Sequence, residues 1–370
     1  MTVRPWRPML GAGVVVVSLA GVPPASAHVD LTFASWSGPY MRSQMLAFVR
    51  PFEQETGNRV EVVFYNGGLE DMRMQVRSAN VKWDVIDLLE EDLIRACEAG
   101  LLETIDPAIL LPGRDGTSPE EDFIDNGLHP CGVGTMAWAT AIGYDPDAFP
   151  RAQPQTLADF FDVQRFPGQR GLQRDPRIVM EWALLADGVP ADEVYEILAT
   201  PAGADRALAV MDPIKPYVTW WQEANDPIDM LNDGRVAITS IWGGEMTDAI
   251  LRRDEEIVPI WDGLVLKLDH LAVLKGSPNR ETALEFIRFA TATEALAEQV
   301  RHIYHSPARQ SSMPLIDDEV KAYLPTTPEH MATAIENDAR FWADNHERLQ
   351  RRFEEWLAVP LQKGLAGAPR

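Results

Sequence analysis

The sequence predicts an α/β protein folded into two lobes. Short apolar runs alternate with amphipathic stretches along the chain, which is typical of strands that alternate with helices. The chain has 370 residues, and 343 remain once an N-terminal segment of 27 residues, interpreted below as a leader, is removed. This length exceeds what one hydrophobic core usually supports, so we expect two lobes.

The first 27 residues follow the order of parts in a secretory signal peptide. Arg4 and Arg7 form a short basic region, the apolar run 9–22 follows, and small residues end at Ala27. We therefore expect export to the periplasm with cleavage after Ala27. A membrane anchor is the alternative, but this run is short and Gly-rich, whereas a spanning helix needs roughly 20 predominantly apolar residues.

The first part of the mature chain reads as strand and helix in turn. Val29 to Phe33 alternates like a strand, and apolar residues then recur at helical spacing from Met41 to Phe52. Pro51 lies inside that helical pattern and predicts a kink or a shortened helix. Further strands are expected at 60–64 and 83–88, and further helices at 69–76 and around Cys97, ending at Gly100.

The second part is punctuated by proline and is richer in helix patterns. Short helices are expected at 157–161, 178–185 and 191–198, and the last of these opens after Pro190. Strands are expected at 235–241, 257–261 and 271–274, a helix around 283–290, and a long charged helix at 328–356.

The net charge of the chain indicates which classes of partner it can bind. The leader holds two arginines and no acidic residue, so the mature chain keeps 31 basic and 56 acidic residues, a net charge of −25. A strongly acidic surface repels nucleic acid and anionic lipid and favours cationic partners. We expect no nucleic-acid partner. The Gly-rich stretches lack the spacing of a phosphate loop or a dinucleotide fingerprint, and we expect no cofactor.

Two cysteines, Cys97 and Cys131, remain after the leader. An even count in an exported protein predicts a disulfide between them. The alternative is a catalytic thiol at Cys131, which precedes the Gly-rich stretch 132–134. No Cys/His spacing fits a zinc site, and the pair His302 and His305 has no third ligand, so no metal site is expected.

Six short segments, taken in order, carry a resemblance to a known family. They are 34–40, 56–62, 83–87, 138–144, 237–244 and 275–283. Through them, nearly all of the mature chain resembles the spermidine/putrescine-binding family of periplasmic proteins. The resemblance implies the type II periplasmic binding fold, in which two α/β lobes joined by crossover segments hold the ligand between them.

The same resemblance sets the expected boundaries of the lobes. After the signal peptide at 1–27, residues 28–140 form the first part of lobe 1 and residues 141–242 form lobe 2. Residues 243–310 return to lobe 1, and residues 311–370 are C-terminal helices that pack on lobe 2.

Candidate ligand residues are mainly aromatic and acidic side chains that follow predicted strands. Open α/β sheets bind ligands at the carboxyl ends of their strands. An ammonium group over an indole face gains about 0.5–2 kcal/mol, and a charged hydrogen bond to a carboxylate adds roughly 1.5–3 kcal/mol. Arg174 instead suits a ligand carboxylate. The candidates are Trp36, Tyr40, Glu90, Trp138, Arg174, Trp242, Glu245, Asp269 and Tyr304.

These residues and the resemblance together predict a periplasmic solute-binding component of an ABC importer. We expect it to be a monomer that captures a small amine by lobe closure and then docks on a membrane permease. Putrescine or spermidine, a γ-amino acid and a quaternary amine all remain open as ligands. A sugar-binding protein of the same fold is one alternative. An enzyme using Cys131 is a weaker one, because no sequence pattern supplies a nucleophile with its base.

Overall fold

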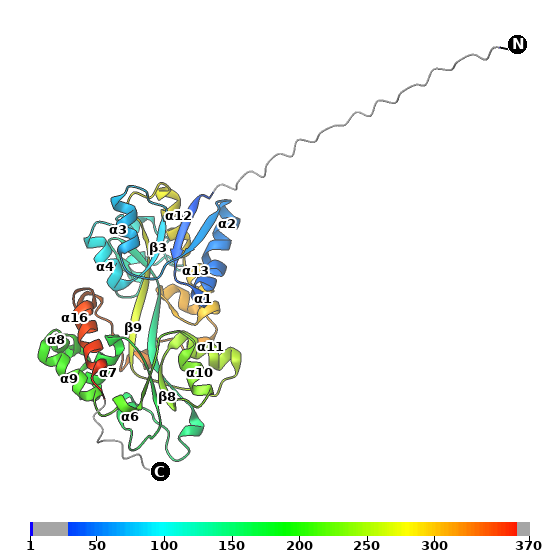
Figure 1. Cartoon of the computed structure of the whole chain (residues 1–370). Helices are drawn as coiled ribbons and strands as arrows, with labels where there is room; N and C mark the ends of the chain where they lie inside the picture. The colour runs from blue at the N-terminus through cyan, green and yellow to red at the C-terminus, as the bar shows by residue number, and fades with distance from the viewer. Residues whose placement is uncertain (3–28, 361–370) are drawn as a thin grey trace.

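The computed structural model describes residues 1–2 and 29–360. Two lobes lie one above the other in Figure 1, and two long strands run through the waist between them. The cleavage site expected after Ala27 lies outside the described residues. Within the described part of the chain, no helix is both long and apolar enough to cross a membrane.

Lobe 1, at the top of Figure 1, is a parallel sheet flanked by helices. Its first strand pairs in parallel with the two that follow it in sequence. The strands are β1 (Leu31–Ser35), β2 (Val60–Phe64) and β3 (Val85–Leu89). The helices are α1 (Gly38–Gln44), α2 (Arg50–Thr56), α3 (Glu70–Arg77), α4 (Glu90–Glu98), α5 (Pro119–Asp122), α12 (Arg280–Ala290) and α13 (Thr293–Ile303).

Lobe 2, at the bottom of Figure 1, repeats this arrangement with its own parallel strands. The strands are β6 (Arg170–Gln173), β7 (Val218–Trp221) and β8 (Ile238–Trp242). The helices are α6 (Leu157–Phe161), α7 (Pro176–Ala186), α8 (Val194–Leu198), α9 (Pro201–Met211), α10 (Asp226–Asn232) and α11 (Gly243–Arg253).

Two antiparallel strands, β5 (Gly132–Tyr144) and β9 (Val258–Val273), join the lobes into one sheet. β9 pairs with β3 in lobe 1, and β5 pairs with β8 in lobe 2. The sheet order is therefore β2-β1-β3-β9-β5-β8-β6-β7. The short strands β4 (Leu128–His129) and β10 (Ser306–Pro307) pair with β5, and β11 (Ile335–Glu336) pairs with β9.

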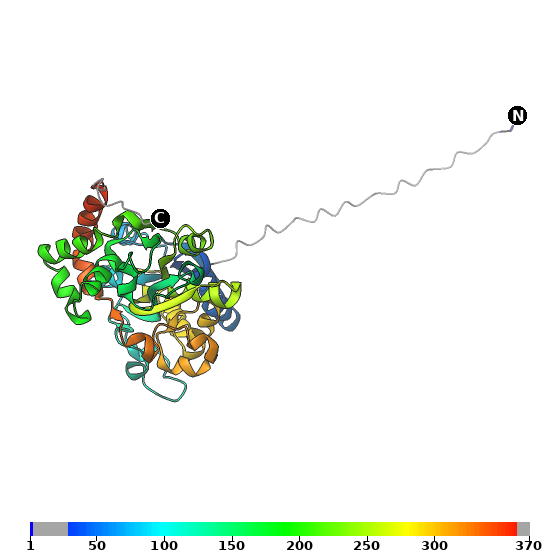
Figure 2. The ribbon, with the colours of Figure 1, turned by 90° about the horizontal axis from the view of Figure 1, so that it is seen from below.

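The C-terminal part of the described chain runs back across both lobes. Short helices α14 (Asp318–Lys321) and α15 (Pro328–Met331) precede the long helix α16 (Ala339–Ala358). Figures 1 and 2 show α16 in red beside the green helices of lobe 2. Its first turns also reach lobe 1, where Arg340 forms an ion pair with Glu98 of α4.

The structure confirms the α/β fold, with corrections to individual elements. The strands expected at 257–261 and 271–274 are the two ends of β9. The helix expected from 328 starts only at Ala339, because 335–336 pair with β9 as a strand. β5 was not predicted as a strand, since nearly all of its residues are buried and its sequence does not alternate. Near Pro51 the helix passes through a π-helical turn, Met45–Val49.

The lobe boundaries set from the sequence remain a proposal. The chain passes between the lobes on β5 and β9 and again ahead of α16, so a boundary falls inside a strand. In the structure α11 lies against β5 and β8, on the side of lobe 2.

Candidate ligand-binding site

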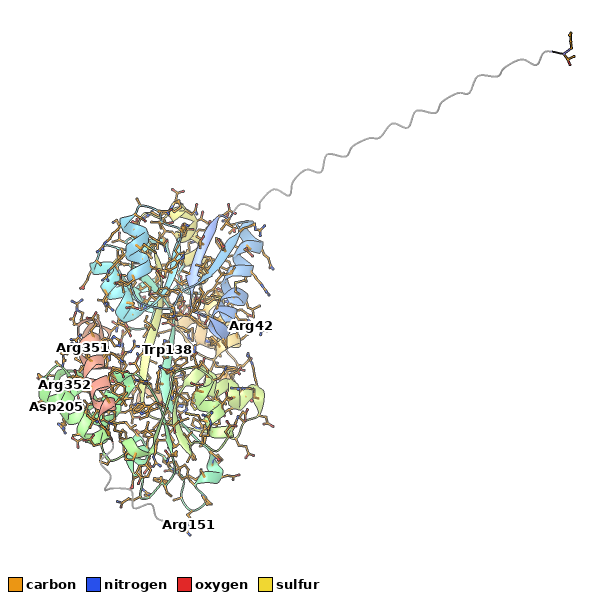
Figure 3. All side chains as sticks on the ribbon, viewed as in Figure 1. Arg42, Trp138, Arg151, Asp205, Arg351 and Arg352 are labelled. Carbon is orange, nitrogen blue, oxygen red and sulfur yellow. A yellow bond between two sulfur atoms is a disulfide. The ribbon has the colours of Figure 1, made fainter. Side chains whose placement is uncertain are left out.

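The lobes meet at the middle of the two crossing strands. There Trp138 of β5 pairs with Lys267 of β9, and Asp269 lies two residues further along β9. Residues two apart on a strand share a face, so Lys267 and Asp269 point the same way. Asp87 of β3 is on this face as well, because it pairs with Leu271, two residues beyond Asp269. Figure 3 labels Trp138 at this waist.

Asp87 and Asp269 form a buried pair of carboxylates, which we call the acid pair. Asp87 is fully buried and Asp269 is 4% exposed. Oδ2 of Asp87 accepts a hydrogen bond from Tyr40 Oη at 2.7 Å and another from Gln44 Nε2. Oδ1 of Asp87 and Oδ1 of Asp269 are buried without a partner among the described residues.

The electrostatics of the acid pair favour a bound cation. Burial raises the pKa of Asp87 to about 7, in spite of the hydrogen bonds from Tyr40 and Gln44. Burial and the charge of Asp87 raise the pKa of Asp269 well above its usual range, and nearby Lys267 offsets this only in part. Two buried like charges are stabilised either by a shared proton or by a cation. An ammonium group supplies both the charge and the N–H donors that the free oxygens lack.

Tryptophan side chains frame the acid pair. The indole N–H of Trp36 lowers the pKa of Asp87, and the indole N–H of Trp138 lowers the pKa of Asp269. Neither Nε1 atom reaches full hydrogen-bond geometry, and both are buried without a partner in the described part of the chain. Trp242 stands edge-on to Trp138, with ring centroids 6.1 Å apart. Indoles beside carboxylates favour an organic cation.

Positive charges lie next to the acid pair. Nη1 of Arg177 donates to Glu91 Oε1 at 2.7 Å, while Nε and Nη2 donate to Asp175 at 2.9 and 2.7 Å. Lys267 is 4% exposed, and its ammonium lies 3.9 Å from Glu91 Oε1 and 5.7 Å from the ring centroid of Trp138. Burial and the charge of Arg177 lower the pKa of Lys267. Within the described residues, Lys267 Nζ has no hydrogen-bond acceptor.

Two neutral polar groups complete the site. The backbone N–H of Asn337 donates to Leu266 O at 2.9 Å, which continues the β11–β9 register and sets Asn337 level with Lys267. Asn337 is 7% exposed, and neither its amide oxygen nor its amide nitrogen has a partner among the described residues. The hydroxyl of Thr140, two residues from Trp138, is also buried and unpartnered there. Buried polar groups normally have partners, so these atoms are available to a ligand.

The backbone that carries Arg177 is unusual. Asp175 caps α7, accepting a hydrogen bond from the Arg177 N–H at 2.8 Å, and Pro176 follows it. Ile178 then adopts φ +72°, a left-handed conformation that a β-branched residue rarely takes. Such strain costs roughly 1–3 kcal/mol and is concentrated at ligand sites. It turns the chain so that Arg177 points between the lobes.

The structure brings together five of the residues that the sequence marked as candidates. Trp36 and Tyr40 lie at Asp87, Asp269 completes the acid pair, Trp138 lies beside Asp269, and Trp242 packs against Trp138. The other four lie elsewhere.

Arg174 is not in the cleft, which corrects its expected place. Its side chain is 45% exposed and pairs with Glu354 of α16 at 2.7 Å. The non-helical backbone at Arg177 and Ile178 follows Arg174, and the two arginines have different ion-pair partners, Glu354 for Arg174 and Glu91 and Asp175 for Arg177. Arg177, three residues further on, is the arginine that contacts lobe 1, through Glu91.

Glu90 faces the C-terminal segment instead of the acid pair. Burial raises its pKa to about 7, helped by the charges of Glu91, Asp338 and Glu336. Successive helical residues point about 100° apart, so Glu91 rather than Glu90 faces Arg177 and Lys267.

Among the described residues, neither Glu245 nor Tyr304 has a hydrogen bond or a ring contact with the acid pair. Glu245 lines a hollow of about 370 Å³ between α1 and α11, and burial and Asp248 raise its pKa to about 7. Tyr304 packs under the guanidinium of Arg252, which lies 4.8 Å from its ring centroid.

Sequence reasoning missed Asp87, Lys267, Arg177 and Asn337. Two of them carried a signal, since Asp87 and Lys267 are charged residues inside predominantly apolar strands. Such residues are rarely buried without a role. Arg177 lies only three residues after Arg174, so spacing in the sequence does not indicate which of the two arginines faces the cleft. Asn337 lies in a stretch that reads as a helix, so nothing in the sequence marked it.

The expected disulfide is confirmed. Cys97 at the end of α4 and Cys131 ahead of β5 are bonded, with Cα atoms 5.8 Å apart. Cys131 is therefore not a free thiol. Together with His129, these cysteines are the one group of three potential metal ligands in the described part of the chain, and both sulfurs are committed to the disulfide.

Comparison with known proteins agrees with this geometry. The chain is 35% identical over 329 residues to a γ-aminobutyric acid-binding protein of Pseudomonas aeruginosa, covering 89% of this chain and 91% of that protein. It is 22% identical to the spermidine/putrescine-binding periplasmic protein of Escherichia coli, over 86% and 88% of the two chains.

A solved γ-aminobutyrate (GABA) receptor superposes with a TM-score of 0.80 at 28% identity, covering 90% of this chain and 98% of that one. The family model for bacterial extracellular solute-binding proteins matches residues 47–327. With its two lobes and the polar site buried between them, the chain belongs to the family of bacterial extracellular solute-binding proteins.

Proposed function

We propose that this chain is the periplasmic solute-binding component of an ABC importer and that it captures a short ω-amino acid, such as γ-aminobutyrate. Two relatives support this class of ligand, since the Pseudomonas aeruginosa protein and the solved receptor are both named for γ-aminobutyrate. In this chain, the side chains at the two ends of the site favour the same class of ligand.

The acid pair is the observation that carries the proposal. A ligand ammonium between Asp87 and Asp269 would donate to the two carboxylate oxygens that are buried without a partner among the described residues. Each charged hydrogen bond contributes roughly 1.5–3 kcal/mol. The indoles of Trp36 and Trp138 beside the pair add cation–π attraction of about 0.5–2 kcal/mol.

The other end of the site suits a carboxylate. Lys267 Nζ and Asn337 Nδ2 are donors without an acceptor among the described residues. Arg177 adds positive charge nearby, although Asp175 and Glu91 already occupy three of its N–H groups. Residues two apart on a strand are about 6.6 Å apart. A spacer of a few carbons therefore bridges Asp269 and Lys267.

This arrangement disfavours a diamine. A second ammonium group in place of the carboxylate would approach the buried ammonium of Lys267, which already lies at reduced pKa. Like charges in a buried site repel strongly because little water screens them. Lys267 is thus the residue that selects a zwitterion over putrescine.

Capture follows from the position of the site between the lobes. Asp87 and Trp36 belong to lobe 1, Trp242 and Arg177 belong to lobe 2, and the crossing strand β9 supplies Lys267 and Asp269. Only the closed form brings all of these groups to the ligand, so binding shifts the open–closed equilibrium toward closure. The closed form is the one that we propose docks on the permease.

Titration calorimetry on the mature protein tests this function. The ligands are γ-aminobutyrate, putrescine, spermidine, choline and maltose, each applied to wild type and to Lys267→Met. We expect wild type to prefer γ-aminobutyrate, and Lys267→Met to lose affinity for it at least tenfold while gaining affinity for putrescine. Tight binding of maltose alone would refute an amine site, and a wild-type preference for putrescine would refute the zwitterion.

A further inference from the structure

We propose that Glu91 is a positioning residue that clasps the two lobes together through Arg177, so that it sets the lifetime of the closed form without contacting the ligand. The inference rests on the proposed function in one respect, since its effect on affinity requires a ligand that binds between the lobes. Its effect on the lobes themselves does not.

The ion pair spans the gap between the lobes. Glu91 lies in the first turn of α4 in lobe 1, and Arg177 lies at the start of α7 in lobe 2. Their side chains meet at 2.7 Å, with Glu91 8% and Arg177 23% exposed. Since α4 and α7 are carried by different lobes, this contact is lost when the lobes separate.

Arg177 is anchored to lobe 2 independently of Glu91. Its Nε and Nη2 hold the two oxygens of Asp175 at 2.9 and 2.7 Å, a bidentate arrangement with strong directionality. The turn through Ile178, with φ +72°, fixes the backbone beside it. Opening therefore leaves Arg177 with Asp175 and removes only the Nη1 contact to Glu91.

The carboxylate of Glu91, on lobe 1, is ionised and can therefore pair with Arg177. Burial raises its pKa, but Lys267 and Arg177 together keep that pKa below its usual value, so the carboxylate stays ionised. The N-terminal turn of α4 also favours a negative charge. Lys267, the other cation near it, lies 3.9 Å away, beyond hydrogen-bond distance.

In the closed form, Arg177 contacts the other lobe, and different residues contact the ligand. Asp175 and Glu91 occupy three N–H groups of Arg177, so the ligand carboxylate is left to Lys267 and Asn337. Arg177 then holds the lobes closed around the ligand instead of binding it. Removing the charge of Glu91 should speed ligand release, because the closed form then loses this contact between the lobes.

The experiment compares wild type with Glu91→Gln, Arg177→Gln and the double variant. Arg174→Gln is the matched control, since Arg174 lies three residues before Arg177, is exposed and, among the described residues, forms an ion pair with Glu354 alone. The dissociation constant and the association and dissociation rates for γ-aminobutyrate are measured by calorimetry and stopped-flow fluorescence. Small-angle scattering of the unliganded proteins and of their complexes reports the separation of the lobes.

We expect Glu91→Gln to weaken binding at least fivefold, through faster dissociation. The double variant should be no weaker than Arg177→Gln alone, and Arg174→Gln should match wild type. Unchanged affinity in Glu91→Gln would overturn the clasp. Tighter binding would overturn it too, because Glu91 would then be competing with the ligand carboxylate.

Failure of the proposed function is distinguishable from failure of the clasp. If wild type binds none of the amines, the ligand assignment is wrong, and scattering still decides the clasp. Glu91→Gln must then show a larger radius of gyration than wild type and Arg174→Gln. Identical scattering curves would overturn the inference.

Discussion

Replacing Asp269 with asparagine removes one negative charge from the acid pair while keeping the shape of the side chain. Asp269 Oδ1 has no partner among the described residues, so the change breaks no hydrogen bond at that atom. The side chain is 4% exposed, and burial together with the charge of Asp87 raises its pKa well above the usual range. The folded protein therefore bears a cost for ionising this group, and a ligand ammonium relieves it.

Two effects of opposite sign follow from Asp269→Asn. Losing a charged hydrogen bond to the ligand costs roughly 1.5–3 kcal/mol, which corresponds to about 10- to 150-fold weaker binding. Losing the repulsion with Asp87 should stabilise the unliganded protein near pH 7, on the order of 1 kcal/mol, or about 2 °C in Tm for a chain of this size. The variant is expected to bind worse and to melt higher.

Calorimetry with γ-aminobutyrate and thermal unfolding without ligand measure the two effects. Asp318→Asn serves as the control, because that side chain is 96% exposed on α14. A variant that loses both affinity and stability would show that Asp269 has a structural role. Unchanged affinity would refute the acid pair as the ammonium site.

Three further predictions concern pH, the tryptophan frame and the disulfide. Because the pKa of Asp87 is raised from 3.8 to about 7, the folded protein retains protons that the unfolded chain releases. This group's contribution to stability is therefore lost as pH rises from about 4 through about 7. An ammonium ligand displaces those protons, so affinity should rise between pH 6 and pH 8, with proton release detected by calorimetry in two buffers; falling affinity would contradict this. Trp242→Ala, which empties the space beside Trp138 and Trp221, should weaken binding at least tenfold by calorimetry and keep the circular dichroism spectrum, and unchanged affinity would place the cleft elsewhere. Replacing Cys97 and Cys131 with alanine opens a loop spanning 34 residues and should lower the free energy of unfolding by about 2–4 kcal/mol with little effect on affinity, whereas lost binding in a folded variant would tie the disulfide to the site.

The overall fold was largely predictable from the sequence. The start of β1 alternates apolar and polar residues, and helices such as α12 repeat apolar residues at helical spacing. β5 was not predicted because almost all of its residues are buried and it lies between neighbouring strands. Such a strand lacks the alternation of apolar and polar residues that marks a half-exposed strand. β11 was not predicted because a two-residue strand depends on its pairing with β9, which is far away in the sequence.

The site was predictable where function follows the end of a strand. Trp36 comes directly after β1 and Trp242 ends β8, so topology alone points to them. Lys267 and Asp269 lie in mid-strand, and they become a site only because β9 crosses from one lobe to the other. That crossing is a property of the whole sheet, which local patterns do not reveal.

Arg174 and Arg177 show most clearly what the sequence alone does not predict. Arg174 and Arg177 are three residues apart and chemically equivalent, and spacing favours neither. The Asp175 cap, Pro176 and the left-handed Ile178 turn one side chain outward and the other into the cleft. Backbone strain of this kind is stabilised by tertiary contacts and has no reliable signature in a single sequence.

A crystal structure of the mature protein with γ-aminobutyrate would test the central claim most directly. We expect the ammonium within hydrogen-bond distance of both Asp87 and Asp269, and the carboxylate beside Lys267 and Asn337. A ligand bound the other way round, or bound in the hollow between α1 and α11 that Glu245 lines, would contradict it.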